Sequence, residues 1–207
     1  MFDAVLFDLD GTLIDTVPMI TRCFQYVFSK YGHKALSDTD VHALFGPAES
    51  VIFSREFGDR WPEVLTTYLQ CYRQGHATLS MSEDMMHLMK ELHGYGSKLA
   101  IVTNKERDTT DITLNHFDLA QMFDVVVTAE DVPQPKPQPY GILSALKALA
   151  VDSSRAVLVG DTMNDVNAAH AAGVAVIQGT WFVPNPPLAR GWMVADTIKV
   201  LRQLLLD

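Results

Sequence analysis

The chain opens, after Met1, with Phe2-Asp3-Ala4-Val5-Leu6-Phe7-Asp8-Leu9-Asp10-Gly11-Thr12, and this stretch decides the fold. Its apolar run from Ala4 to Phe7 is continuous and ends in a turn signal, which is typical of a short strand buried on both faces of a parallel sheet. Asp8 then lies at the carboxyl end of that strand. In open α/β sheets, ligands bind in the crevice beyond this edge.

Asp8 and Asp10 are two residues apart, so on an extended backbone their side chains point the same way. Two carboxylates held this close raise one pKa unless a cation lies nearby. A turn that simply ends a strand would also explain an isolated D-x-D-G. Three further motifs at strand ends favour a functional site instead.

Two later stretches repeat the pattern of an apolar run capped by small polar or acidic residues. They are Leu99-Ala100-Ile101-Val102-Thr103-Asn104 and Ala156-Val157-Leu158-Val159-Gly160-Asp161-Thr162-Met163-Asn164-Asp165. Between them, Pro135-Lys136-Pro137-Gln138-Pro139 holds one lysine in a stretch that the proline rings restrict. Taken singly, the last acidic pair could be the first turn of a helix and Lys136 an exposed loop lysine.

Together the four motifs resemble those of the haloacid dehalogenase superfamily, whose members are mostly Mg²⁺-dependent phosphatases. The resemblance extends from Asp8 to beyond Asp165. The spacing is most similar to the phosphoglycolate phosphatase and pyrophosphatase branch, and the short Gly179-Thr180-Trp181 stretch is part of that likeness. It implies hydrolysis of a small phosphomonoester, phosphoglycolate-like, or of pyrophosphate.

The resemblance also implies a role for each motif residue. Asp8 would attack phosphorus to give an aspartyl-phosphate, and Asp10 would give and take the proton. Phosphate contacts would come from Thr103 and Lys136, from backbone N–H groups of Leu9 and Asn104, and from the mobile turn that begins at Gly11 and Thr12. The Mg²⁺ ligands would be oxygens of Asp8, Asp10 (its backbone carbonyl), Asp161 and Asp165.

The sequence after Asp15 changes to a helical period, and four helices are expected before the next strand. They run to Gly32, from about Asp38 to Phe45, from Pro47 to near Gly58, and onward from Trp61-Pro62. An insertion of this length is too long for an ordinary crossover. In the superfamily it is the helical cap of the C1 type, so residues 16–80 are expected to form a cap and residues 1–15 and 81–207 the catalytic core.

The rest of the chain alternates strands and helices, which predicts a doubly wound parallel, Rossmann-like α/β sheet. Ser80-Met81-Ser82-Glu83 resembles a capping box before a helix with Met85, Leu88, Met89 and Leu92 inward. The remaining expected strands are 99–102, 125–127, 156–159, 174–177 and 192–195. The remaining helices are 107–116, 139–150 (with Ile142, Leu143, Leu146 and Leu149 inward), one through 167–172, and 197–206, and a loop is expected at 178–191.

Composition excludes several classes of protein. The 207 residues carry a net charge of −9, which argues against nucleic-acid binding but not against a small phosphorylated substrate bound with a divalent cation. No stretch has the length or pattern of a membrane span or a secretory signal. Cys23 and Cys71 lack a disulfide or metal pattern and are expected to be free thiols. We therefore expect a cytoplasmic enzyme, monomeric or homodimeric.

Three other functions remain to be weighed. A dehalogenase of this fold would not need Asp10, since a halide leaves without a proton. A phospho-accepting signalling domain would combine similar residues, but the helical insertion argues against it. A sugar-phosphate mutase would need cap cations for a second phosphate, whereas the six Lys and Arg residues between Thr16 and Ser80 are matched by six acids. The stretch Thr16-Val17-Pro18-Met19-Ile20 also lacks the histidine of the mutase branch.

Overall fold

The computed structural model describes residues 1–182 and 192–206. Its centre is a six-stranded parallel sheet with the strand order β3-β2-β1-β4-β5-β6. This order confirms the predicted doubly wound α/β fold. The strands are β1 (Ala4–Phe7), β2 (Lys98–Val102), β3 (Val125–Val127), β4 (Ala156–Gly160), β5 (Ala175–Gly179) and β6 (Met193–Ala195).

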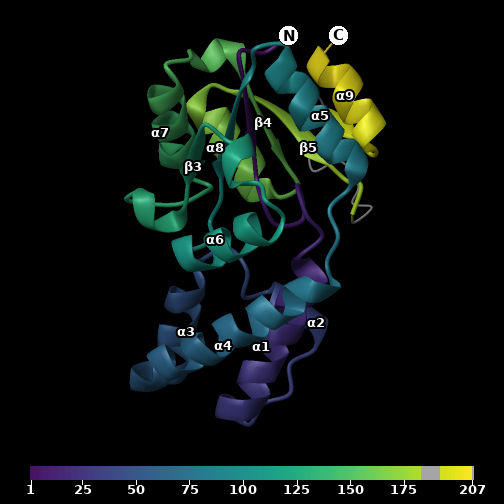
Figure 1. The fold of residues 1–207 in the computed structure, drawn as a ribbon. Helices are drawn as coiled ribbons and strands as arrows, with labels where there is room; N and C mark the ends of the chain where they lie inside the picture. Colours follow the sequence, from purple (N-terminus) through teal and green to yellow (C-terminus); the bar gives the residue numbers. More distant parts are fainter. Residues whose placement is uncertain (183–191, 207) are drawn as a thin grey trace.

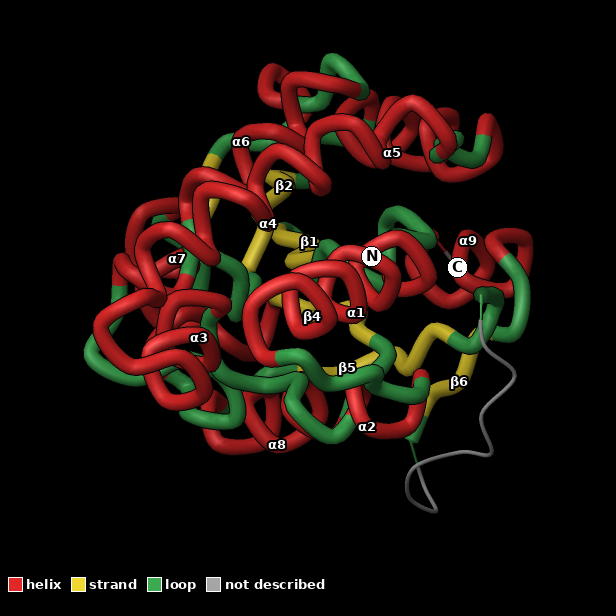
Figure 2. Tube along the Cα trace, turned by 90° about the horizontal axis from the view of Figure 1, so that it is seen from below, coloured by secondary structure: helices red, strands yellow, loops and turns green. Residues whose placement is uncertain are grey.

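Strand β1 lies in the middle of the sheet, and its four side chains are fully buried. Because side chains alternate along a strand, Val5 and Phe7 belong to one hydrophobic cluster and Ala4 and Leu6 to another. Helices α5 (Glu83–Gly94) and α9 (Ile198–Leu206) cover the first face, and α7 (Tyr140–Leu149) and α8 (Met163–Ala172) cover the second. Figure 2 shows these layers on either side of the strands.

Four helices follow β1 and lie together beyond the carboxyl ends of the strands (Figure 1). They pack around a third hydrophobic cluster, separate from the two at the sheet. Phe24, Phe53 and Tyr68 form the middle of this cluster, with ring centroids 5.2 to 5.3 Å apart. The helices are α1 (Val17–Gly32), α2 (Asp38–His42), α3 (Glu49–Phe57) and α4 (Trp61–Gly75).

Helix α3 begins two residues later than Pro47, where the sequence analysis placed its start. Ala48 is the N-cap, in an extended conformation, and Gly46 has a positive φ of 126°. The Asn104 side chain donates to the Gly46 carbonyl at 2.9 Å. This contact holds residues before the helix against the sheet and keeps them out of helical geometry.

Two smaller predictions on the core helices are also wrong. The N-cap of α5 is Ser82, whose hydroxyl accepts from the Met85 N–H at 3.4 Å, so Ser80 does not start a capping box. In α7, Leu143 is 42% exposed. It lies one residue outside the buried face that Ile142 and Leu146 share. The inward residues predicted for α5 are all buried.

The expectation of free thiols is contradicted, because Cys23 and Cys71 form a disulfide. They are 48 residues apart in sequence, but α1 packs against α4 and brings their Cα atoms to 5.7 Å. That separation suits a disulfide. Sequence spacing could not reveal the pair, since it depends on how the two helices cross.

Helix α6 (Arg107–His116) and strand β3 have the bounds that the sequence predicts. Of the expected 178–191 loop, Gln178 and Gly179 belong to β5, and residues 183–191 lie outside the described part of the chain. Among the described residues, no helix is long and apolar enough to cross a membrane.

Candidate active site

Asp8 and Asp10 follow the carboxyl end of β1, on the side where α1 to α4 lie, and different groups hold the two carboxylates. The Asp8 side chain is almost buried, and its Oδ1 accepts from the Lys136 ammonium at 2.6 Å. Asp10 accepts from the Thr16 hydroxyl at 2.5 Å on Oδ1, and its Oδ2 lies 2.9 Å from the Lys105 ammonium. The first turn after the strand thus directs the two carboxylates to two separate lysines.

Lys136 joins two carboxylates in the buried centre of the site. Its Nζ lies 2.6 Å from both Asp8 Oδ1 and Asp165 Oδ1. The other oxygen of Asp165 accepts from the backbone N–H and the hydroxyl of Thr162, at 3.0 and 2.5 Å. Asp165 is fully buried, and both of its oxygens are therefore engaged within the protein.

Burial also sets the ionisation of this cluster. It raises the pKa of Asp8 to about 7, although the charge of Lys136 opposes the rise. Asp165 adds to the rise and Asp10 contributes least, so burial outweighs the like-charge effect expected from the D-x-D pair. Burial alone would lower the pKa of Lys136, but the charges of Asp165 and Asp8 outweigh it and raise that pKa well above its usual value.

Asp161 completes a group of three carboxylates with Asp8 and Asp165, whose ligand oxygens lie within 4.8 Å of one another. The Thr12 hydroxyl donates to Asp161 Oδ1 at 3.0 Å. Gly11 has a positive φ of 78°, and a Cβ atom there would lie 2.7 Å from Asp161 Oδ2. Gly11 and Thr12 therefore support Asp161 from behind rather than facing the cavity.

An excess of negative charge characterises this carboxylate group. Burial, followed by the charge of Asp8, raises the pKa of Asp161 to about 8. The single positive charge of Lys136 offsets only part of the negative charge of the three clustered carboxylates. An all-oxygen donor set of this charge fits Mg²⁺, which binds through one or two carboxylates and substrate phosphate.

Thr103 and Asn104 follow β2, beside the end of β1. The Thr103 hydroxyl accepts from the Lys105 N–H at 3.2 Å and keeps its own proton available for donation. The Asn104 side chain bonds both the N–H and the carbonyl of Lys136, at 2.8 and 2.7 Å. Within the described chain, the backbone N–H groups of Leu9 and Asn104 make no hydrogen bond, although buried N–H groups are normally paired.

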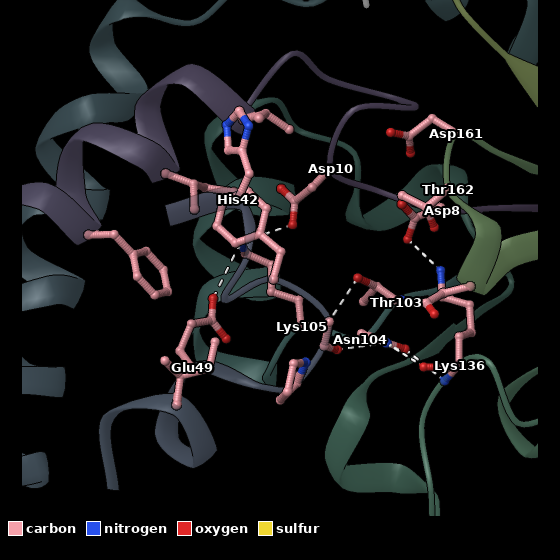
Figure 3. A pocket seen from close by; sticks show the side chains of 18 residues that line it. Asp8, Asp10, His42, Glu49, Thr103, Asn104, Lys105, Lys136, Asp161 and Thr162 are labelled. Atoms are coloured by element: carbon pink, nitrogen blue, oxygen red, sulfur yellow. Dashed lines mark hydrogen bonds and ion pairs between the residues drawn. The ribbon is translucent and has the colours of Figure 1, made fainter. Parts of the chain in front are cut away.

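A cavity of about 380 Å³ lies between the strand ends and helices α1 to α3, and 18 described residues line it (Figure 3). Six of the residues that the motifs single out are among them: Asp8, Asp10, Thr103, Asn104, Lys136 and Asp161. Leu9, Gly11, Thr12 and Asp165 lie behind this wall. None of the six cap Lys and Arg residues lines the cavity, which supplies no cation cluster for a second phosphate.

Sequence reasoning missed two charged residues of this site. Lys105 follows Thr103-Asn104 directly and is 6% exposed, and Glu49, the first residue of α3, is also 6% exposed. Their ammonium nitrogen and carboxylate oxygen lie 3.4 Å apart. The position of Lys105 after the Thr motif was an available signal. Glu49 looked like an ordinary acid in a first helical turn. His42 also lines the cavity.

Comparison with known proteins agrees with this geometry. The sequence-family model of the haloacid dehalogenase-like hydrolases matches residues 5–178 of this chain. The chain belongs to this family. It is also 35% identical to pyrophosphatase PpaX of Bacillus velezensis over 181 aligned residues. The alignment covers 87% of this chain and 84% of PpaX. The predicted superfamily and phosphatase-type hydrolase are thus confirmed.

Solved structures show the same fold as this family member. CbbY from Rhodobacter sphaeroides in complex with phosphate aligns with a TM-score of 0.84 and 22% identity, covering 96% of this chain and 95% of CbbY. A predicted phosphoglycolate phosphatase from Haemophilus somnus aligns with a TM-score of 0.85 and 23% identity, covering 98% of both chains. At these identities the likeness supports the fold alone.

Proposed function

We propose that this family member is a Mg²⁺-dependent phosphatase that hydrolyses a small phosphomonoester, phosphoglycolate-like, or pyrophosphate. The observation that carries the proposal is the Asp8 carboxylate. One oxygen is fixed by Lys136 at 2.6 Å, and the residue lines a cavity of substrate size between sheet and cap. The likeness to PpaX supports pyrophosphate as one of the candidate substrates.

We assign one candidate group to each step of phosphoryl transfer. Asp8 Oδ2 would attack phosphorus, forming the Asp8–phosphorus bond while the bond to the leaving oxygen breaks. Asp10, on the same cavity, would protonate that oxygen and then take a proton from the water that hydrolyses the aspartyl-phosphate. The Thr103 hydroxyl, the N–H groups of Leu9 and Asn104, and the Lys136 ammonium would bind phosphoryl oxygens.

Mg²⁺, when bound, would offset the charge that gathers on the phosphoryl oxygens. Asp8 and Asp161 line the cavity and are our proposed carboxylate ligands, with the backbone carbonyl of Asp10 carried over from the motif resemblance. Asp165 is near enough to be the further ligand that the motif implies. Its engaged oxygens favour a different role, which is to hold Lys136 beside Asp8.

We further propose that residues 16–80 act as a cap over a core formed by residues 1–15 and 81–207. The separate hydrophobic cluster of α1 to α4 supports this division. A cytoplasmic location and a monomer or homodimer stay proposals too. The expected free thiols no longer support a cytoplasmic location, because Cys23 and Cys71 are paired.

The proposal is tested by measuring phosphate release from small phosphate esters and pyrophosphate. We expect turnover with Mg²⁺ that a chelator abolishes and added Mg²⁺ restores. Unchanged rates in excess chelator would contradict the metal site. A single phosphorylation event without repeated release would indicate a signalling domain rather than an enzyme.

A further inference from the structure

The cap side of the cavity is mostly apolar. Its walls there are the side chains of Val17, Ile20, Phe24, Phe45 and Ile52. Figure 3 shows Asp8, Asp161 and Lys136 on one side of the cavity and Glu49 on the other, with Lys105 joined to it. A phosphoryl group bound at Asp8 would therefore leave the rest of the substrate between apolar walls and Glu49.

The Glu49 carboxylate, on the side of the cavity away from Asp8, is incompletely hydrogen-bonded. Its Oε1 lies 3.4 Å from both the Lys105 ammonium and the Tyr68 hydroxyl, which are long contacts. Its Oε2 is buried and has no hydrogen-bond partner among the described residues. A buried carboxylate oxygen without a donor is costly. A substrate group that donates a hydrogen bond would remove this cost.

The lysine beside Glu49 is already committed to other groups. Lys105 lies 2.9 Å from Asp10 Oδ2, and its ammonium is 4.5 Å from the centre of the Tyr72 ring. One cation therefore faces two carboxylates.

Along the described part of the cavity wall, no second cation compensates for this imbalance. Among the described residues that line the cavity, the only other lysine is Lys136, at Asp8, and there is no arginine. His42 contributes a ring nitrogen 3.2 Å from the Thr21 hydroxyl. A substrate with a second anionic group would place that group near Glu49 with no unpaired cation to receive it.

We propose that Glu49 determines specificity, and that the preferred substrate is a phosphomonoester whose leaving group is largely apolar, carries no negative charge, and donates from a hydroxyl or amine to Glu49. This inference rests on the proposed phosphatase function and selects within it. We therefore expect phosphomonoesters with a hydrogen-bond donor on the leaving group to be better substrates than phosphoglycolate and pyrophosphate.

Three esters of matched size test this preference. Hydroxyethyl phosphate, phosphoethanolamine and phosphoglycolate share a two-carbon skeleton and differ in a hydroxyl, an ammonium or a carboxylate at its end. We expect the wild-type kcat/KM for the first two to exceed that for phosphoglycolate by about tenfold or more. In Glu49→Gln this discrimination is expected to shrink by about tenfold, because the charge is lost and the shape kept.

Glu106→Gln is the matched control. Glu106 Oε2 accepts at 3.1 Å from the N–H of Ser50, which follows Glu49 in α3. Glu106 itself does not line the cavity. Its variant is expected to keep the wild-type order of substrates. Thermal unfolding and p-nitrophenyl phosphate turnover of each variant report whether the fold and the phosphoryl site are intact.

The wild-type measurement alone can overturn the inference, so it does not depend on how the variants fold. Phosphoglycolate or pyrophosphate as the best wild-type substrate would contradict it. A lower turnover of that substrate by Glu49→Gln would then indicate that Glu49 helps to bind an anionic group. Absence of Mg²⁺-dependent release from all these compounds, p-nitrophenyl phosphate included, would contradict the phosphatase function itself and the inference with it.

Discussion

Asp161 and Asp165 belong to one motif, yet their surroundings differ. Asp161 lines the cavity and is held by the Thr12 hydroxyl, whereas Asp165 is fully buried between Lys136 and Thr162. Spacing alone could place both near Asp8. It could not tell a group that faces the cavity from one that supports a lysine, because that depends on which neighbours occupy the carboxylate oxygens.

Substitution of the two residues should separate these roles. We expect Asp161→Asn to raise the Mg²⁺ concentration for half-maximal activity by about tenfold or more, because a carboxylate facing the metal is lost. Asp165→Asn should mainly lower kcat, since Lys136 loses a charged partner. Phosphate release titrated with Mg²⁺ measures both effects. An equal rise in Mg²⁺ requirement in Asp165→Asn would identify Asp165 as a direct ligand.

His76 is a buried residue outside the catalytic cluster, at 1% exposed. Its ring nitrogens lie 2.7 Å from the Tyr72 carbonyl and 3.0 Å from the Thr113 hydroxyl. Burial lowers the pKa of His76, with an opposing effect of the Tyr72 carbonyl. The folded protein therefore binds this proton less readily than the unfolded chain does.

The sign of the pH dependence follows from that difference. The contribution of His76 to stability is fully present above the unfolded histidine pKa of about 6.5, and it is lost as pH falls through the lowered folded pKa. We expect the free energy of unfolding in urea to decline over this range in the wild type and to decline less in His76→Gln. Identical pH profiles for the two proteins would count against the prediction.

At the scale of elements, the sheet was the most predictable part. Strands in a doubly wound sheet are buried on both faces, so β1, β2 and β4 read as uninterrupted apolar runs. Helix starts were less predictable, since Asn104 displaces the start of α3 from Pro47 through its contact with Gly46. The Cys23–Cys71 disulfide was missed for the same reason: it depends on packing between distant helices.

That disulfide leads to a prediction for α1 and α4. It closes a loop of 48 residues, and loss of such a cross-link typically costs about 2–4 kcal/mol of stability. Reductant should therefore lower the urea midpoint of the wild type, while the double variant Cys23→Ser, Cys71→Ser should be less stable and insensitive to reductant. Two titratable thiols in the untreated protein, with a midpoint that reductant leaves unchanged, would contradict the disulfide.

At the scale of the molecule, three consecutive residues after β2 join the core to the start of α3. Asn104 donates to the Gly46 carbonyl, Lys105 lies beside Glu49, and Glu106 accepts from the Ser50 N–H. The motifs predicted that Asp8, Thr103 and Asp161 lie close together, because each follows the end of a strand. They could not place the cap wall, since contacts between residues 46–50 and 104–106 arise only in the folded chain.

In the proposed mechanism, Asp8 accepts the phosphoryl group. This step is tested most directly by quenching the enzyme in acid during turnover with Mg²⁺ and mapping the added phosphoryl mass by peptide mass spectrometry. We expect this mass on Asp8, and we expect folded Asp8→Asn to show neither the adduct nor turnover, because the amide keeps the shape but is not a nucleophile. Substantial turnover by Asp8→Asn, or a phosphoryl group on another residue, would contradict the mechanism.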